Sequence, residues 1–291
     1  MDSEQSIINN NNKTTDYKVW FITGASSGIG LQLALNLISQ GYSVAGTSRH
    51  LSNIENKINS ERFLPLEVDL VNEESVSNAL KKTVEKFGRV DVIVNNAGQS
   101  ILGALEEFSD SEIRDLFDSN LFGPLNVIRH SLKYLRVQKS GLIYNISSIA
   151  GFMENAMTGG YSATKFALSG VSESLKEELK PFGIQVCSVN PGMVKTAILN
   201  KIMYPNEVIA DYQSREMLNA FYKYRESINL PGTDADKLAK LLIDVSLETD
   251  IPAYLFCGVD ANNTSKDKIT KLTDTINKNE KRAGIDILES K

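Results

Sequence analysis

The amino-acid sequence predicts an α/β protein with a single doubly wound parallel sheet that carries helices on both faces. Two observations support this fold class. Short apolar runs alternate with longer amphipathic stretches from Lys18 onward, and a glycine-rich turn joins the first run to the first stretch. Strands that alternate with helices form right-handed βαβ units, whose parallel sheet is covered on both faces. No linker or internal repeat interrupts the chain after Lys18, which indicates one domain over residues 17–291.

The apolar runs have the length of buried strands, and the stretches between them have the periodicity of helices. The predicted strands are residues 19–23, 43–48, 63–69, 92–95, 142–147, 185–190 and 253–257. The predicted helices are residues 29–40, 73–87, 110–138 and 161–182. In the last of these, Ala163, Ala167 and Val171 recur every four residues, which places them on one face of a helix.

Three segments depart from this alternation. Residues 1–16 have few apolar side chains and a run of asparagines, so we expect a disordered tail, with an Asn-rich interaction tail as the alternative. Residues 197–232 are rich in bulky apolar and aromatic side chains and are predicted to form a substrate lid, part of which can also pack as a short helix. Residues 262–291 predict a C-terminal helical extension, solvated except for apolar residues at helical spacing.

Composition and charge exclude several classes of function. The chain has 31 basic and 36 acidic side chains, and a net charge of −5 is not the signature of a nucleic-acid-binding protein. The two histidines, His50 and His130, lack the spacing of metal ligands, so we expect no metal site. No run approaches the ~18 apolar residues of a membrane span. Two cysteines and no signal peptide indicate a soluble, cytoplasmic protein.

A glycine-rich turn after the first predicted strand predicts a nucleotide site. Residues 23–30 read TGASSGIG, and an amphipathic helix follows directly. Glycines permit positive φ angles and let the backbone approach a ligand closely, while the helix N-terminus offers N–H groups to a pyrophosphate. The spacing Gly-x3-Gly-x-Gly differs from the usual Gly-x-Gly-x-x-Gly. Its position between a strand and a helix nevertheless predicts a Rossmann-type dinucleotide-binding domain.

The residues after the second predicted strand favour NADP(H) over NAD(H). A domain that binds NAD usually places an acid ~20 residues after the turn, where it holds the ribose 2′-hydroxyl. This chain has Arg49 there, and no acid lies between Gly41 and Ile54. A guanidinium group suits the 2′-phosphate of NADP. The alternatives are that Arg49 is an ordinary surface arginine and that His50 is only an exposed loop residue.

Several polar and glycine residues follow the predicted strands and form a candidate catalytic centre. Tyr161 and Lys165 lie four residues apart, which puts them on one face of a helix. Ser148 lies 13 residues before Tyr161, at the end of a predicted strand. Asn-Asn-Ala-Gly at residues 95–98 and Pro-Gly at residues 191–192 end two further strands. Open α/β sheets bind ligands at the carboxyl ends of their strands, so we expect these groups to lie together.

Taken together, these motifs resemble the short-chain dehydrogenase/reductase family over residues 18–260, and residues 256–261 are similar to its hydroxysteroid-dehydrogenase-like branch. The resemblance implies that Tyr161 donates or accepts the proton, Ser148 holds the substrate oxygen and Asn120 completes a proton relay. It also implies that Lys165 binds the nicotinamide ribose and makes the tyrosine hydroxyl more acidic. The cofactor-binding residues implied in this way include the glycine-rich turn and Arg49. They are Gly24, Ser26, Ser27, Gly28, Ile29, Gly30, Arg49, Asp69, Leu70, Asn96, Ala97, Gly98, Tyr161, Lys165, Pro191, Gly192, Val194 and Thr196.

Asn120 also stands out on physical grounds. Pro124 has no N–H, so the carbonyl of Asn120, four residues earlier, loses its helical partner. That carbonyl could hold an ordered water and bend the predicted helix toward the site. The alternative is a satisfied buried asparagine beside a structural kink.

The sequence thus predicts an NADP(H)-dependent oxidoreductase that acts on a carbonyl or secondary alcohol. The apolar lid favours a lipophilic substrate, such as a steroid-, retinoid- or fatty-acyl-like ketone. A catalytically silent dinucleotide-binding regulator and an epimerase or dehydratase on a related sheet are the alternatives. The Tyr161 and Lys165 pair argues against the regulator, and the glycine spacing argues against the epimerase. By resemblance alone, we expect a homodimer or homotetramer.

Overall fold

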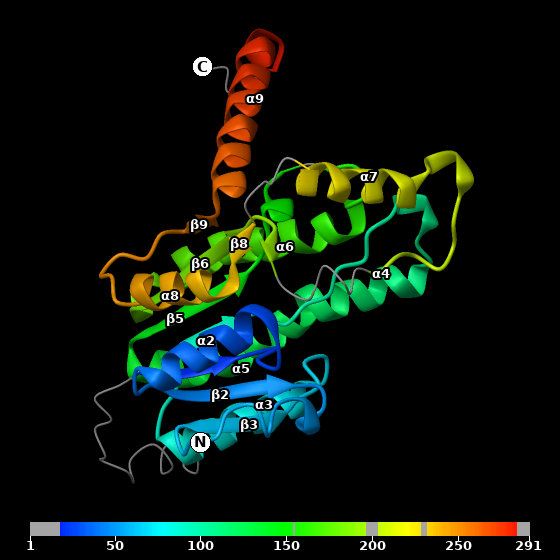
Figure 1. The fold of residues 1–291 in the computed structure, drawn as a ribbon. Helices are drawn as coiled ribbons and strands as arrows, with labels where there is room; N and C mark the ends of the chain where they lie inside the picture. Colours follow the sequence, from blue (N-terminus) through cyan, green and yellow to red (C-terminus); the bar gives the residue numbers. More distant parts are fainter. Residues whose placement is uncertain (1–17, 154, 196–202, 228–231, 284–291) are drawn as a thin grey trace, which may run out of the picture.

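The computed structural model describes residues 18–153, 155–195, 203–227 and 232–283. A parallel seven-stranded sheet in the order β3-β2-β1-β4-β5-β6-β9 forms its centre (Figure 1). All six strand pairs of this sheet are parallel, as predicted. Its strands are β1 (Val19–Ile22), β2 (Ser43–Ser48), β3 (Phe63–Glu67), β4 (Val92–Asn95), β5 (Gly141–Ile146), β6 (Ile184–Pro191) and β9 (Tyr254–Cys257).

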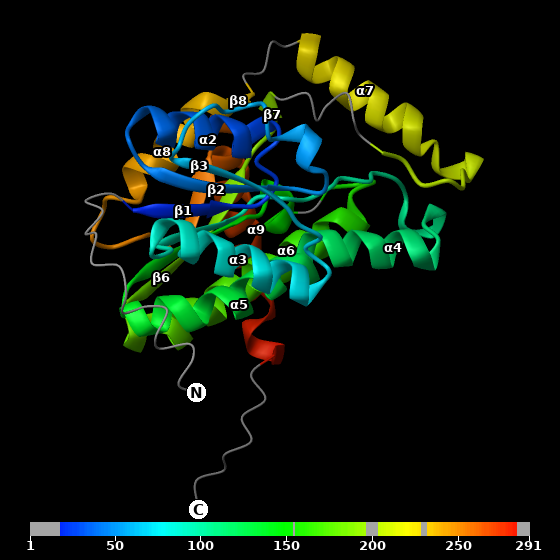
Figure 2. The same cartoon turned by 90° about the horizontal axis from the view of Figure 1, so that it is seen from below.

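Helices cover both faces of the sheet, and Figure 2 shows the resulting three layers. On one face lie α2 (Gly28–Ser39) and α8 (Ala235–Val245), and on the other α3 (Glu73–Phe87), α5 (Gly123–Gln138) and α6 (Gly159–Leu179). The alternation of side chains along β1 explains the two cores. Trp20 packs with the α2 and α8 side of the sheet, whereas Phe21 packs with the α3 and α5 side. The predicted doubly wound α/β fold is therefore confirmed.

Local signals set the helix boundaries near the strand ends. The Asn72 side chain accepts a hydrogen bond from Ser75 N at the start of α3, and Gly88 ends this helix with a φ of 83°. Ser109 and Glu112 form a capping box at the start of α4 (Asp110–Phe117). These caps determine where the connections after β3 and β4 leave the sheet.

The predicted helix over residues 110–138 is interrupted. A π-helical segment, Asp118–Phe122, separates α4 from α5, and in it Gly123 N donates to the carbonyl of Asp118. Pro124 explains the change, because it offers no N–H to the carbonyl of Asn120 and the hydrogen bonding shifts by one residue. Single π-helical turns often mark functional sites, and this one centres on Asn120.

Two short strands and two helices after β6 lie outside the main sheet and its two helix layers. Strands β7 (Val194–Lys195) and β8 (Thr233–Asp234) pair in parallel, and α7 (Ser214–Ser227) lies between them in the sequence. Figure 2 shows α7 beyond the carboxyl ends of the strands. Helix α9 (Val259–Ala283) occupies the region of the predicted terminal helix and projects past β9, away from the sheet (Figure 1).

Some predictions concern residues that the structure does not describe. The predicted tail over residues 1–16 lies outside the described residues, as do residues 196–202 and 228–231 of the predicted lid region and residues 284–291 of the extension. Among the helices that are described, none is long and apolar enough to cross a membrane.

Candidate active site

The glycine-rich turn is packed against the end of β4. The Thr23 hydroxyl accepts hydrogen bonds from Asn96 N (2.9 Å) and Ala97 N (3.0 Å). The Asn96 amide donates back to the carbonyls of Thr23 (2.9 Å) and Gly24 (3.1 Å). A Cβ at Gly24 would lie 2.9 Å from Ala97 Cα, and Gly24 has a φ of 65°, so only glycine fits there. The turn and residues 95–98 therefore form one rigid unit.

The same turn leads into the N-terminus of α2. The first-turn N–H groups of a helix have no intrahelical partners, and the N-cap residue Ser27 makes no side-chain cap hydrogen bond. These donors and the positive end of the helix dipole suit a pyrophosphate. The arrangement fits a dinucleotide, with Gly28 and Gly30 at the helix start.

The ends of β2 and β3 carry the groups assigned to the adenosine half of the cofactor. Arg49 follows β2 and is exposed, and no ion-pair partner for it is found among the described residues. Asp69 is exposed after β3 and accepts a hydrogen bond from Val71 N (3.0 Å). One acid near this edge escaped the sequence analysis: Glu67, opposite Ser48 in the sheet, accepts from Leu51 N (2.8 Å).

The candidate catalytic centre lies where β5 meets α6. Lys165 is 5 % exposed, and its ammonium group donates to the carbonyl of Ile146 (2.9 Å). Its nitrogen lies 5.8 Å from the centre of the Tyr161 ring. Burial disfavours the charged form and lowers the pKa of Lys165 to about 8. The Ser148 hydroxyl accepts from Ala150 N (3.1 Å) as the chain leaves β5.

Asn120 is fully buried, and its side chain joins two elements of this centre. Its Oδ1 accepts from Gln99 N (2.9 Å), and its Nδ2 donates to the Gln99 carbonyl (2.9 Å) and to Thr164 Oγ1 (3.1 Å). Thr164 in turn donates to the carbonyl of Tyr161 (2.8 Å). The side chain is thus occupied in positioning, so a relay through Asn120 would use its main-chain carbonyl in the π-helical segment.

Beneath the centre lies a buried polar layer that sequence reasoning missed. Ser147, Ser169 and Ser188 form a hydroxyl chain with spacings of 3.0 and 3.1 Å. Ser188 donates to Asn190 Oδ1 (3.0 Å), and Asn190 Nδ2 donates to the carbonyl of Ser148 (2.9 Å). Polar residues at the ends of otherwise apolar strands are the signal that could have indicated this layer. It fixes the backbone of Ser148 from below.

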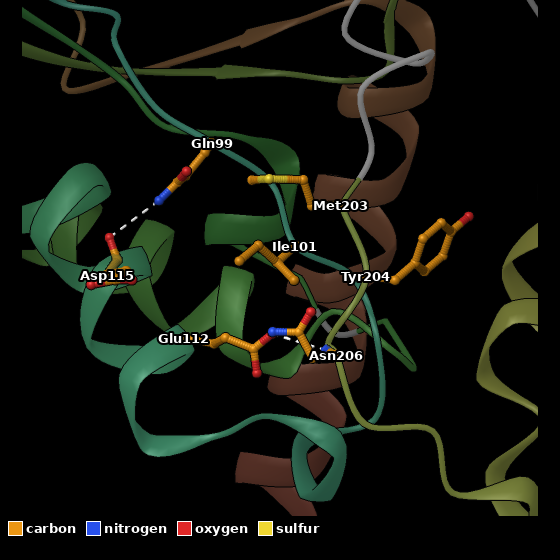
Figure 3. A pocket seen from close by; sticks show the side chains of 7 residues that line it. All are labelled: Gln99, Ile101, Glu112, Asp115, Met203, Tyr204 and Asn206. Atoms are coloured by element: carbon orange, nitrogen blue, oxygen red, sulfur yellow. Dashed lines mark hydrogen bonds between the residues drawn. The ribbon is translucent and has the colours of Figure 1, made fainter. Parts of the chain in front are cut away.

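A pocket of about 430 Å³ lies between the chain after β4, α4 and the segment that follows β7 (Figure 3). It is lined by Gln99, Ile101, Glu112, Asp115, Met203, Tyr204 and Asn206. The two walls are joined by backbone hydrogen bonds from Leu102 N to the Met203 carbonyl (3.0 Å) and from Met203 N to the Ser100 carbonyl (3.3 Å). Its lining combines apolar and aromatic side chains with amide and acidic ones.

A buried carboxylate anchors the described part of the predicted lid. Glu107 is 1 % exposed and accepts hydrogen bonds from Ile209 N (3.1 Å), the Ser214 hydroxyl (2.9 Å) and Ala104 N (2.9 Å). Burial alone would raise the pKa of Glu107, but the bonds from Ser214, Ile209 and Ala104 outweigh it, so the pKa lies below its usual value. Nearby, Glu112 Oε1 accepts from Asn206 N (2.9 Å).

Comparison with known proteins identifies the family to which this site belongs. A family model described as short chain dehydrogenase matches residues 18–206. The chain belongs to the short-chain dehydrogenase family. It is therefore an oxidoreductase, and short-chain dehydrogenases act on small-molecule substrates. The predicted family is confirmed, whereas the hydroxysteroid-dehydrogenase-like branch stays a prediction.

Three similar proteins support this membership. The 3-ketodihydrosphingosine reductase of Bacteroides thetaiotaomicron is 41% identical over 199 residues, which cover 67% of this chain and 72% of that protein. A short-chain dehydrogenase from Streptomyces avermitilis superposes with a TM-score of 0.82 at 32% identity, over 91% of this chain and 98% of that one. The NADP-bound structure of ElxO has a TM-score of 0.70 and 29% identity, over 83% of this chain and 97% of that one.

In this short-chain dehydrogenase the sequence-predicted residues lie along one edge of the sheet. Residues 24–30 and 96–98 follow β1 and β4, and Ser148 follows β5. Residues 191–194 run from the last residue of β6 to the first residue of β7. Tyr161 and Lys165 lie on α6, and the π-helical segment adds Asn120. Arg49, Asp69 and Leu70 follow the outer strands β2 and β3. Thr196 lies outside the described residues.

Proposed function

We propose that this oxidoreductase uses NADP(H) to interconvert a lipophilic ketone and its secondary alcohol, with Tyr161 as the general acid and base. The observation that carries the proposal is the buried Lys165 ammonium beside the Tyr161 ring, which also donates to the carbonyl of Ile146, two residues before Ser148. The two histidines of the chain, His50 and His130, lie after β2 and on α5, and no described hydrogen bond joins either of them to Tyr161, Lys165 or Ser148. When bound, the nicotinamide supplies or accepts the hydride.

The chain's own residues would manage the proton. In the direction of reduction, the Tyr161 hydroxyl donates its proton to the substrate oxygen as charge develops there. A cation ~4–6 Å away stabilises the resulting phenolate by a few kcal/mol at an effective dielectric of ~20. The Ser148 hydroxyl donates a hydrogen bond to the same oxygen and fixes its position. Asn120 keeps residues 98–100 and α6 in register, so that the carbonyl carbon of the substrate stays near Tyr161.

The preference for NADP(H) rests on the end of β2. Arg49 is exposed at the place where the 2′-phosphate of the cofactor would lie, and Glu67 is held by the backbone of Leu51. The NADP-bound ElxO structure is in keeping with this preference. The cytoplasmic location stays a prediction from the cysteine content.

The lipophilic substrate is supported by the pocket in Figure 3 and by the lid beside it. Ile101, Met203 and Tyr204 give the pocket apolar surface, and methionine adapts to ligands of different shape. Exposed Val208, Met217 and Phe221 continue this apolar character along the lid. A similar protein is named a 3-ketodihydrosphingosine reductase, after a keto substrate.

The test is a panel of alkyl ketones of increasing chain length, assayed in parallel with NADPH and NADH. We expect kcat/KM to rise with chain length, because each methylene that is buried adds up to ~0.8 kcal/mol of favourable binding free energy.

Tyr161→Phe should lower kcat by at least ~100-fold and leave the Kd of the cofactor unchanged. Arg49→Ala should weaken NADPH by roughly 10- to 150-fold and barely affect NADH, since it removes a charged hydrogen bond.

Three results would contradict separate parts of the proposal. Normal turnover by Tyr161→Phe rejects the assigned acid and base. A wild-type preference for NADH, or equal loss of both cofactors in Arg49→Ala, rejects the phosphate assignment. Fast turnover of a small charged keto acid together with a flat trend along the alkyl series rejects the lipophilic substrate.

A further inference from the structure

Three hydrogen bonds join the chain that follows β6 to residues near the carboxyl end of the protein. Gly192 N donates to the carbonyl of Cys257 (2.9 Å) at the end of β9. The Met193 carbonyl accepts from Thr233 N (2.7 Å) in β8. Met193 N donates to Asp260 Oδ2 (3.0 Å) in the first turn of α9. Both backbone polar groups of Met193 are therefore engaged by residues 40 to 67 positions later in the sequence.

The contact between Asp260 and Gly192 is unusually close. A Cβ built on Gly192 would lie only 2.0 Å from Asp260 Oδ1, so no other residue fits at position 192 while the carboxylate stays in place. Asp260 Oδ1 also accepts from Ala261 N (2.9 Å), which ties the carboxylate to α9 itself. The carboxylate thus lies directly against the backbone of residues 192 and 193.

The surroundings allow this carboxylate little freedom. Gly258 has a φ of 107°, and a Cβ there would lie 2.4 Å from Thr233 Oγ1 and 2.7 Å from Asp260 Oδ1. Thr233 Oγ1 donates to the carbonyl of Cys257 (3.2 Å). Gly192 and Gly258 therefore leave room for Asp260 and Thr233 to reach the same loop. The hydrogen bond from Met193 N to the Asp260 carboxylate is also of a stronger kind than one between neutral groups.

We propose that Asp260 is a positioning residue for the nicotinamide end of the cofactor. It acts through Gly192 and Met193, whose backbone it fixes at the carboxyl end of β6. The inference rests on the proposed function and on the family resemblance, which implies that Pro191, Gly192 and Val194 bind the cofactor. These residues lie at the end of β6, beside β5 and Ser148, and so on the nicotinamide side of the proposed site. Asp260 lies in α9, beyond the last strand of the sheet, so the terminal helix determines the geometry of a loop in the candidate site.

The distinguishing test compares the whole cofactor with its adenosine half. Asp260→Ala removes the acceptor for Met193 N, so we expect the Kd of NADPH, measured by calorimetry, to rise by roughly 10-fold. The glycine turn and the ends of β2 and β3 are untouched, so binding of 2′,5′-ADP should change by no more than about twofold. Asp267→Ala, at an exposed position of the same helix, is the matched control and should match the wild type in both titrations.

A mutant cycle tests the contact itself. Gly192→Ala alone should weaken NADPH binding strongly, because the new methyl group meets the carboxylate. Adding Asp260→Ala removes the obstructing oxygens, so the double variant should bind NADPH more tightly than Gly192→Ala alone. Asp260→Asn keeps one acceptor oxygen and nearly the same shape, and it should give an intermediate Kd. This milder variant keeps the test available if Asp260→Ala does not fold.

The outcomes separate the inference from the proposed function. Failure of the wild type to bind NADPH or NADH rejects the proposed function itself; if it prefers NADH, the same titrations use NADH and 5′-AMP. Tight cofactor binding by the wild type and unchanged binding by Asp260→Ala overturn the inference alone. Equal weakening of the whole cofactor and of the adenosine fragment also overturns it, because a general loss of structure would produce that result.

Discussion

At the residue scale, the candidate site depends on a few buried polar groups whose environments differ from water. Lys165 is the clearest case, because its ammonium group is buried and donates a hydrogen bond to the carbonyl of Ile146. Asn120 is also buried, but the polar atoms of its side chain contact the loop after β4 and α6. A buried charge is costly to maintain, so its retention beside Tyr161 points to a role in catalysis.

The lowered pKa of Lys165 leads to a prediction about pH. In the free enzyme Lys165 is charged below its pKa of about 8 and neutral above it. If the ammonium group supports cofactor binding and Tyr161, then kcat/KM for the cofactor is level below about pH 8 and falls by about tenfold per pH unit above it. A pH profile of initial rates measures this fall.

The matched variant is Lys165→Arg, whose guanidinium group keeps its charge throughout this range. Its activity should be lower, because the larger group fits poorly, but the decline near pH 8 should disappear from its profile. A wild-type decline that begins only near pH 10, the range of an exposed lysine, would contradict this account.

At the element scale, the structure shows how segments distant in sequence are joined around the site. The π-helical segment places Asn120 against Thr164 of α6, and the chain after β4 forms one wall of the pocket in Figure 3. The other wall, residues 203–206, is held by backbone hydrogen bonds and by Glu112. Glu107 then fixes residues 209 and 214, where α7 begins.

This anchoring predicts the effect of Glu107→Gln. An amide has one acceptor oxygen in place of two, so at least one donor among Ala104 N, Ile209 N and Ser214 loses its partner. We expect the free energy of unfolding to fall by ~1–3 kcal/mol. We also expect KM to rise for long-chain ketones and to change little for short ones, since the proposed lid would contact mainly the alkyl chain of the substrate. Steady-state kinetics and urea denaturation measure the two effects.

The control for this prediction is Glu106→Gln, an exposed neighbour that accepts one hydrogen bond from the Tyr212 hydroxyl (2.6 Å). Glu106→Gln should change neither the free energy of unfolding nor the KM for long-chain ketones by much.

The lowered pKa of Glu107 adds a condition on pH. Because the folded-state pKa is below the unfolded value, the contribution of Glu107 is complete above the unfolded value of 4.5 and is lost as pH falls through the folded one. Equal KM changes for short and long ketones would rule out a lid anchor.

At the scale of the whole molecule, the outer surface of the α3, α5 and α6 layer carries exposed aromatic and apolar side chains. Phe166 on α6 is 44% exposed, Phe122 at the start of α5 is 49% exposed, and Val137 near its end is also exposed. Large apolar side chains on a helix layer often mark a contact between subunits. This surface is the support for the proposed homodimer or homotetramer.

The corresponding prediction concerns Phe166→Glu. A charge at this position disfavours burial against a second copy, so the variant should elute as a monomer where the wild type is a dimer or tetramer. Light scattering coupled to size exclusion gives the mass directly. Leu247→Glu, at another exposed apolar position, should leave the mass unchanged. A monomeric wild type, or an unchanged mass for Phe166→Glu, would contradict an interface on this layer.

The sequence predicted the sheet better than it predicted the connections. Every predicted strand of the main sheet is present, with ends that agree or differ by at most two residues, because buried apolar runs between helices have few alternative folds. Helix α8 and the strands β7 and β8 were not predicted, since β7 and β8 are two residues long and have no apolar alternation of their own. The π-helical turn was anticipated only as a bend at Pro124.

The candidate site, too, could be predicted only where its residues form a motif that is local in the sequence. Tyr161, Lys165, Ser148 and the glycine-rich turn could be found because their spacing along the chain is short and repeats a known motif. Glu107 and Asp260 could not, because the partners that define their roles lie 102 to 107 and 67 positions away, and only the folded chain brings them together. An isolated acid in a sequence does not indicate which backbone N–H it will bind.

The pairing of β7 with β8 has a consequence for how such a protein can change over evolution. Val194 lies opposite Thr233, and Lys195 lies opposite Asp234, so the two ends of the intervening segment are fixed side by side. Lengthening a loop whose ends already meet costs little, roughly 0.6 kcal/mol for each doubling of its length. The segment between these strands can therefore be exchanged for one of another size while the hydride-transfer machinery stays in place. The residues that select the substrate and the residues that carry out the reaction could then change independently.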